Sequence, residues 1–107
     1  MIRRSLLIGI GVLGCSLAAL AASTVHMVDQ NKLQFSVAAL TIQQGDVIKF
    51  TNSDRPAHNI LVSDGKKVLN SGLQQPGEPF EIPFPNKGQY TVTCGIHPKM
   101  QMAVTVQ

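Results

Sequence analysis

A seven-residue segment near the C-terminal end, Cys94–Met100, constrains the fold of this chain more than any other stretch. Its sequence is CGIHPKM, and it lies between residues 88–93 and 103–106, in both of which apolar and polar residues alternate. A period of two is typical of β-strands that are buried on one face. The pattern predicts a short loop between two strands, with Cys94 ending the first strand and Met100 beginning the second.

This loop is rich in side chains that bind metals. It carries the thiol of Cys94, the imidazole of His97 and the thioether of Met100, and a second imidazole, His58, lies far upstream where a predicted loop meets a predicted strand. Each of these residue types is common in ordinary protein cores when it occurs alone. Two His, one Cys and a weak axial Met together form the donor set of an electron-transfer copper site. The combination predicts that these four residues hold one copper ion.

The rest of the chain predicts an all-β fold. Alternating segments are separated by turn residues at a spacing of roughly eight to twelve residues, which is typical of a small sandwich or barrel. Further strands are predicted at residues 24–28, 33–37, 40–42, 47–52, 58–62 and 80–84. A polar turn is expected at residues 29–32, and no regular element is expected in the glycine- and proline-containing segment 63–79. Pro83 predicts an edge strand, because proline cannot donate to a neighbouring strand.

The first 22 residues have the composition of an export signal. A short basic segment precedes an apolar run, and the run ends in small residues. This order is that of a secretory signal peptide. We therefore expect cleavage after Ala21 or Ala22, which divides the chain into a removable signal, residues 1–22, and one domain, residues 23–107.

Two alternatives for the N-terminal segment remain open. The apolar run from Leu6 to Ala22 has 17 residues, which just reaches the length of a membrane-spanning helix. Cys15 follows a sequence loosely similar to a lipobox, so a lipid anchor is the second alternative. The glycines within the run and its small-residue end favour cleavage over both.

Removal of the signal changes the charge and the cysteine content. Residues 23–107 carry seven basic and six acidic residues, so the domain is nearly neutral, and its charge gives no reason to expect nucleic-acid binding. Cys94 is the only cysteine in this range and has no partner for a disulfide within the chain. An unpaired thiol in an oxidising compartment is a liability unless a metal occupies it. No catalytic triad, phosphate-binding glycine loop or paired-carboxylate site is apparent, so an enzyme is not expected.

The domain resembles the cupredoxins, the group of small blue copper proteins that includes plastocyanin, pseudoazurin and amicyanin. The residues that carry the resemblance are Gly45 and Asp46 before a strand, the pair His58 and Asn59, Gly88 and Tyr90 leading to Cys94, and the CGIHPKM loop. Two residues separate Cys94 from His97 and two separate His97 from Met100, which makes the loop most similar to that of amicyanin. The resemblance implies a cupredoxin-like Greek-key β-sandwich of about seven to eight strands, with the ligand loops at one end.

The resemblance also implies a role for each residue of the site. Cys94, His58 and His97 would surround a type 1 (blue) copper that cycles between Cu(I) and Cu(II), with Met100 as the long axial ligand. Asn59 would donate its backbone N–H to the sulfur of Cys94, and its side chain would tie the two ligand loops together.

Three further residues are weighed as ligands and set aside. Met102 lies at a longer spacing from His97, but the register of the closing strand in relatives favours Met100 and places Met102 in the core. His26 and Met27 occupy the first strand after the predicted signal, where an exposed or packing role is expected.

The expected function is that of a periplasmic electron carrier. Its partners would be redox proteins, such as a c-type cytochrome, a dehydrogenase or an oxidase, that dock near His97 and Pro98, and the chain is expected to be a monomer with no membrane span in its mature form. The alternative is a periplasmic copper trafficking or storage protein that uses the same ligands. That alternative has less support, because only His26, Met27 and Met102 could add exchangeable donors. A metal-free sandwich is disfavoured by CGIHPKM and His58.

Overall fold

The computed structural model describes residues 23–107, and these residues form nine β-strands. The strands are β1 (Val25–Asn31), β2 (Gln34–Phe35), β3 (Ala39–Ile42), β4 (Val47–Asn52), β5 (His58–Ser63), β6 (Val68–Gln74), β7 (Phe80–Pro83), β8 (Gly88–Cys94) and β9 (Gln101–Val106). In this part of the chain no helix is long and apolar enough to cross a membrane. The predicted signal, residues 1–22, lies outside the described residues.

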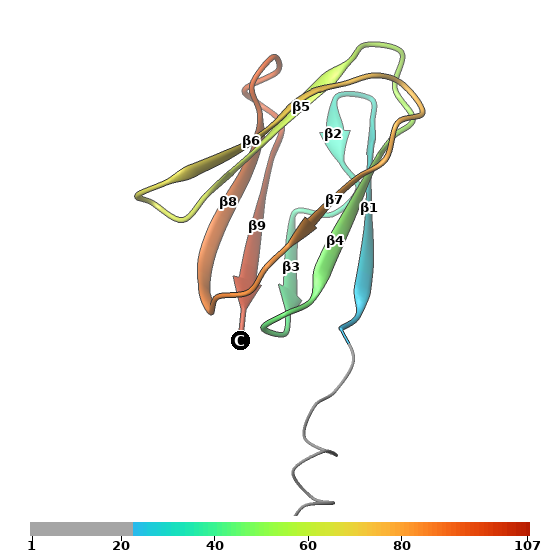
Figure 1. Ribbon diagram of the computed structural model, residues 1–107. Helices are drawn as coiled ribbons and strands as arrows, with labels where there is room; N and C mark the ends of the chain where they lie inside the picture. Colours follow the sequence, from blue (N-terminus) through green and yellow to red (C-terminus); the bar gives the residue numbers. More distant parts are fainter. Residues whose placement is uncertain (1–22) are drawn as a thin grey trace, which may run out of the picture.

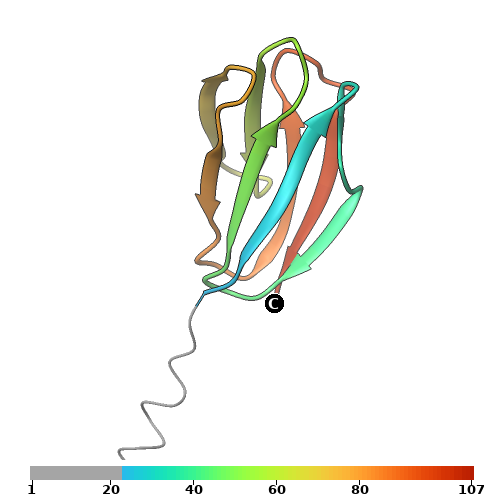
Figure 2. The same cartoon turned by 90° about the vertical axis from the view of Figure 1, so that its right-hand side faces the viewer.

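The strands form two sheets that face each other (Figure 1). One has the order β2-β1-β4-β7, whose face is seen in Figure 2, and the other has the order β3-β9-β8-β5-β6. Every second residue of β4, β5 and β9 is buried, so the alternation in the sequence does mark the faces that form the core. β7, which contains Pro83, is an edge strand as predicted. The prediction of an all-β sandwich is confirmed, with nine strands instead of seven or eight.

The pairing of β5 with β8 brings the two predicted ligand segments to one end of the sandwich. The strands are antiparallel, and Ile60 pairs with Cys94. The beginning of β5, where His58 lies, is therefore next to the end of β8. The loop from Gly95 to Met100 continues from that point and lies at the end of the molecule opposite the C-terminus (Figure 1).

The strand that the sequence analysis missed is β6, which lies within the segment expected to be irregular. Most of its residues are exposed, so it lacks the alternation that marks a strand. Gly72 has φ of 79°, and the register between β5 and β6 shifts between Asn59 and Leu61. A glycine with positive φ is typical of one class of β-bulge, the G1 bulge. Gly72 therefore allows a bulge inside the strand instead of ending it.

The polar segment predicted as a turn is also assigned differently by the structure. β1 continues through Asn31, and Gln30 in it is fully buried. The amide of Gln30 donates to the carbonyl of Thr51 and to Oε1 of Gln74, at 3.1 and 2.7 Å. Because Gln74 belongs to the opposite sheet, this bond links the two sheets near the ligand end. The polar residues of this segment predict a turn, but hydrogen bonds allow Gln30 to be buried in a strand.

The turn between β1 and β2 consists of Lys32 and Leu33, which have φ of 56° and 58°. Two-residue hairpin turns of this kind normally contain Asn, Asp or Gly, and other residues in the left-handed region cost about 1–2 kcal/mol each. The carboxylate of Asp54 accepts both turn N–H groups, at 2.7 Å from Lys32 and 3.0 Å from Leu33. These two hydrogen bonds offset the strain and hold the turn.

We expect Leu33→Gly to leave the free energy of unfolding nearly unchanged. The relief of about 1–2 kcal/mol of backbone strain offsets the loss of a side chain that is 47% exposed. Leu69, on β6, is 46% exposed and is not in the left-handed region, so Leu69→Gly is the matched control and should lower the free energy of unfolding by about 1–2 kcal/mol. Urea titrations of both variants give the measurement, and equal losses would contradict the strain argument.

At the opposite end of the sandwich from the ligand loops, Asp46 organises the chain around β4. Its carboxylate lies 2.9 Å from Nε2 of His26 and accepts the N–H groups of Gln43 and Thr24. The hydrogen bond from His26, followed by those from Gln43 and Thr24, lowers the pKa of Asp46 from 3.8 to about 2. His26 thus has a structural role and Met27 is 60% exposed, as predicted.

Because of the Asp46 carboxylate, the free energy of unfolding depends on pH in the acid range. A pKa that is lower in the folded protein stabilises the fold above the ordinary pKa, and this contribution is lost as the pH falls from 3.8 towards about 2. We expect the free energy of unfolding to decrease through that range, and to decrease less steeply in Asp46→Asn. Urea titrations at several pH values test this. Glu81→Gln, on the exposed face of β7, is the control, and an unchanged slope in Asp46→Asn would contradict the assignment.

Candidate metal centre

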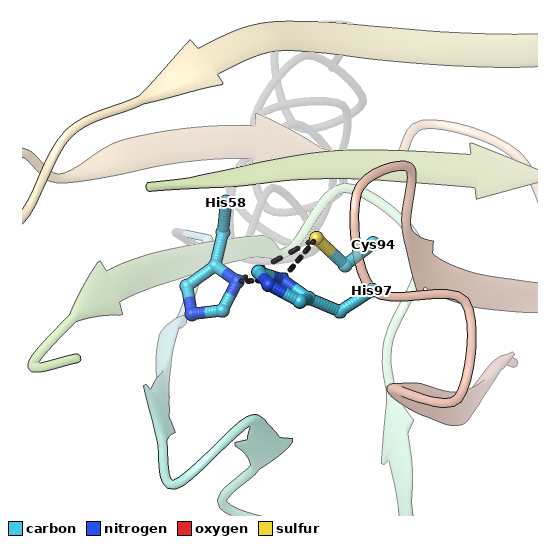
Figure 3. Close-up of side chains that lie close together, drawn as sticks. All are labelled: His58, Cys94 and His97. Carbon is cyan, nitrogen blue, oxygen red and sulfur yellow. Dashed lines mark hydrogen bonds between the residues drawn. The ribbon is translucent and has the colours of Figure 1, made fainter. Parts of the chain in front are cut away.

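Three of the four predicted ligands converge at the ligand end of the sandwich (Figure 3). The sulfur of Cys94 lies 3.5 Å from Nδ1 of His58 and 3.6 Å from Nδ1 of His97, and the two Nδ1 atoms are 3.2 Å apart. The two rings are inclined at 68° to each other. In the part of the chain that the structure describes, this is the cluster of His, Cys and acidic residues with the geometry to hold a metal ion.

The size of this triangle fits a first-row transition metal. A point equidistant from its three corners lies about 2.0 Å from each donor atom, which is close to the metal–nitrogen and metal–sulfur bond lengths of such sites. A thiolate and two imidazoles in a trigonal arrangement are the donors of blue copper sites. The residues present therefore fit copper in both donor chemistry and dimensions.

His58 is fixed by its position and by a hydrogen bond on its outer side. It is the first residue of β5 and is completely buried. Its Nε2 lies 2.9 Å from Oδ2 of Asp54. An ionised carboxylate can only accept, so Nε2 carries a proton, and the lone pair of the corresponding neutral tautomer lies on Nδ1, which faces Cys94. The ring is thereby held in the tautomer that a metal ligand needs.

Asp54, which the sequence analysis did not single out, holds this ligand and the β1–β2 turn at once. Burial raises the pKa of Asp54, but the hydrogen bonds from the N–H of Leu33, from His58 and from the N–H of Lys32 outweigh it, so that the pKa lies below its usual value. The carboxylate is consequently charged at neutral pH. A carboxylate four residues before a histidine ligand is the signal that was available in the sequence, but the same spacing is common in ordinary loops.

Cys94 is held by the neighbouring strand. It ends β8 and is 1% exposed. The backbone N–H of Asn59 donates to its sulfur at 3.3 Å, and the N–H of Gly95 donates to the carbonyl of Asn59 at 2.8 Å. The predicted bond from the Asn59 backbone is confirmed. An N–H directed at the sulfur orients it.

The predicted role of the Asn59 side chain is wrong. Its amide donates to Oδ1 of Asn70 and to the carbonyl of Gly72, so it ties the His58 strand to β6 and not to the loop that follows Cys94. The loop that follows Cys94 packs closely against the Asn59 side chain. A Cβ added at Gly95 would overlap Oδ1 of Asn59. A larger residue at position 95 would force the amide of Asn59, which is held by two hydrogen bonds, to move.

The two predicted ligands other than His58 and Cys94 lie in the loop between β8 and β9. His97 is partly exposed, whereas Met100 is 2% exposed. The N–H of Met100 donates to the carbonyl of His97 at 2.9 Å, which makes a tight turn between them. Met102 is 3% exposed and packs in the hydrophobic core, as predicted. The axial role of Met100 itself stays a prediction.

Comparison with known proteins identifies the family. The family described as copper binding proteins of the plastocyanin/azurin family matches residues 22–107. The chain belongs to this family. The prediction of copper as the cofactor is thus confirmed. The family binds copper, and the cysteine sulfur and the two histidine nitrogens are spaced to hold one metal ion.

Individual relatives of this plastocyanin/azurin-family protein are distant. The chloroplastic plastocyanin of Tetradesmus obliquus is 31% identical over 100 residues, which cover 83% of this chain and 69% of that protein. An amicyanin variant in its reduced Cu(I) form superimposes with a TM-score of 0.72 at 25% identity and covers 84% of this chain and 89% of its own. A purple cupredoxin from Nitrosopumilus maritimus gives a TM-score of 0.69 at 29% identity, over 77% and 99% of the two chains.

We expect Asp54→Asn to weaken copper binding. The substitution removes the carboxylate that accepts the hydrogen bond from His58. It also places an amide N–H₂ next to three N–H groups, those of Lys32, Leu33 and His58. Loss of a group that hydrogen-bonds a metal ligand typically lowers metal affinity by about 10–100-fold. Competition with a Cu(I) chelator gives the measurement. Asp64→Asn is the matched control, because Asp64 also accepts two turn N–H groups, from Lys66 and Lys67, but touches no ligand. Equal affinities in the two variants would contradict the assigned role.

Proposed function

We propose that this chain is an electron carrier with one type 1 copper, held by His58, Cys94, His97 and Met100. The observation that carries the proposal is the convergence of one sulfur and two Nδ1 atoms within 3.2–3.6 Å of one another. When bound, copper supplies a one-electron couple, Cu(I)/Cu(II), in such a donor set. The similarity to plastocyanin and amicyanin supports the same assignment, and an enzymatic role is not proposed.

The protein's contribution is to keep its donor atoms in place. His58 is held by Asp54, and the sulfur of Cys94 by the N–H of Asn59. Both ligands are buried in a sheet, so neither is free to rearrange when the charge at the site changes. A donor set that moves little suits rapid electron transfer, because reorganisation adds to the barrier.

Electrons would enter and leave through His97. Its ring is partly exposed, and it lines a surface groove together with Ile96 and Pro98. Redox proteins meet through small and transient interfaces, which an apolar surface of this kind can provide. The partner would be a c-type cytochrome, a dehydrogenase or an oxidase that docks near His97 and Pro98, and the carrier would act as a monomer.

We also propose that the protein works in the periplasm. The support is the basic, apolar and small-residue order of residues 1–22, which is that of an export signal cleaved after Ala21 or Ala22. The single cysteine of the domain is consistent with an oxidising compartment if copper occupies its thiol.

Copper trafficking or storage is the alternative, and the burial of the ligands argues against it. A protein that hands on its metal needs donors that a partner can reach, whereas His58 is 0% and Cys94 is 1% exposed. His26, one of the residues that could have extended a trafficking site, is bonded to Asp46 at the far end of β1.

Addition of one equivalent of Cu(II) to residues 23–107 should produce an intense thiolate-to-copper absorption band towards the red end of the visible spectrum and a narrow copper hyperfine splitting in EPR. Cys94→Ser should lose the band, since the thiolate is its origin. Visible and EPR spectra give the measurement. A pale spectrum of ordinary tetragonal Cu(II) would rule out the blue site and favour trafficking.

The two buried methionines provide a control for the axial ligand. Met100→Ala should change the position and relative intensities of the absorption bands and shift the reduction potential. Met102→Ala should leave the spectrum unchanged and lower the free energy of unfolding by about 2–5 kcal/mol, because it leaves a cavity in the core. The opposite pattern would make Met102 the ligand.

A further inference from the structure

The groove beside His97 is formed by two segments that are distant in the sequence. One is the β1–β2 turn and the other is the loop between β8 and β9. The lining residues that matter here are Lys32, Leu33, Ile96, His97, Pro98 and Lys99. The β1–β2 turn therefore extends the surface around His97 beyond the ligand loop itself.

The centre of this surface is apolar. Leu33 is 47% and Ile96 is 48% exposed, and Pro98 is exposed as well. These side chains come from both segments and flank His97. Exposed apolar side chains that cluster around a functional group mark an interaction site more often than isolated ones do.

The turn that presents Leu33 is strained and is tied to the metal site. Both of its residues have left-handed backbone, and both N–H groups donate to Asp54, whose other bond holds His58. Strained backbone persists where the surroundings fix it, and it clusters at functional sites. One carboxylate thus sets the position of Leu33 relative to a predicted ligand.

The rim of the groove is positively charged. Both charged residues that line it, Lys32 and Lys99, are lysines. The nearby carboxylate of Asp54 is 10% exposed, and its oxygens are already bonded to two N–H groups and a histidine, so they are not free to bind groups of a partner. Charges of one sign at the rim of a binding surface attract a partner of the opposite sign and accelerate its association.

We propose that the Lys32–Leu33 turn and the Ile96–Lys99 segment form one docking surface, and that its partner is an electron-transfer protein with an acidic docking face. Leu33, Ile96 and Pro98 supply the apolar centre, and Lys32 and Lys99 supply the charges. The proposal rests on the proposed electron-carrier function and specifies its partner. One electron passes from the reduced copper protein to the oxidised partner, and no bond is formed or broken.

The test uses one cytochrome in two charge states. A basic c-type cytochrome and the same cytochrome with its lysines succinylated serve as ferric acceptors for the reduced copper protein in stopped-flow measurements. At low ionic strength we expect the succinylated, acidic form to react at least about tenfold faster, and salt to reduce this preference. Lys32→Gln and Lys99→Gln should each lower the rate with the acidic form several-fold. Lys87→Gln, in the turn before β8 at the opposite end, should not.

A binding measurement separates docking from electron transfer. In the Cu(I) protein, addition of the succinylated cytochrome should shift the amide resonances of residues 32–34, Ile96, His97 and Lys99. Leu33→Gly, which is expected to keep its stability, should weaken that binding while leaving the visible spectrum of the Cu(II) form unchanged.

The outcomes distinguish the docking proposal from the function beneath it. If the blue spectrum is present but the two cytochromes react equally, or if Lys87→Gln has the same effect as Lys32→Gln, net charge or another surface is responsible and the docking proposal is overturned. Amide shifts confined to another face would overturn it as well. Absence of the blue spectrum would instead overturn the electron-carrier function.

Discussion

The antiparallel pairing of β5 with β8 is the constraint on which the metal centre depends. With Ile60 opposite Cys94, the first residue of β5 comes within reach of the last residue of β8. The same register directs the N–H of Asn59 at the sulfur. A shift of one residue in this pairing would place His58 and Cys94 on opposite faces of the sheet, and the burial of the alternate residues of β5 opposes such a shift. The hydrophobic pattern of the sandwich thus also sets the position of two ligands.

Asp54 extends this order from the sheet to the surface. Its carboxylate accepts hydrogen bonds from the imidazole of His58 and from the backbone N–H groups of Lys32 and Leu33. The turn residues lie more than twenty positions before Asp54 in the sequence. A neutral side chain could not accept all three hydrogen bonds without presenting a donor to one of them. A single partly buried charge therefore fixes the tautomer of a predicted ligand and stabilises a turn whose residues disfavour it.

Local pattern in the sequence was sufficient to predict most of the fold and to single out three side chains that the structure brings together, His58, Cys94 and His97. Alternation predicted eight of the strands, and the spacing within CGIHPKM indicated the loop and its ligands. β6 was missed because its residues are largely exposed and Gly72 hides a bulge, and the role of the Asn59 side chain was mistaken because its partners lie on that strand. Asp54 could not be recognised, since its function depends on a turn that only the tertiary fold brings close.

The proposed donor set divides into a rigid half and a half that belongs to a loop. His58 and Cys94 lie in adjacent strands, are buried, and are each bonded to a second group that orients them. His97 and Met100 lie in a short loop between two strands, where one backbone hydrogen bond joins them. Because Gly95 packs directly against Asn59, the start of this loop is anchored to the rigid half. His97, which is partly exposed, is thus the proposed donor that joins the rigid half to the surface, next to the proposed docking surface.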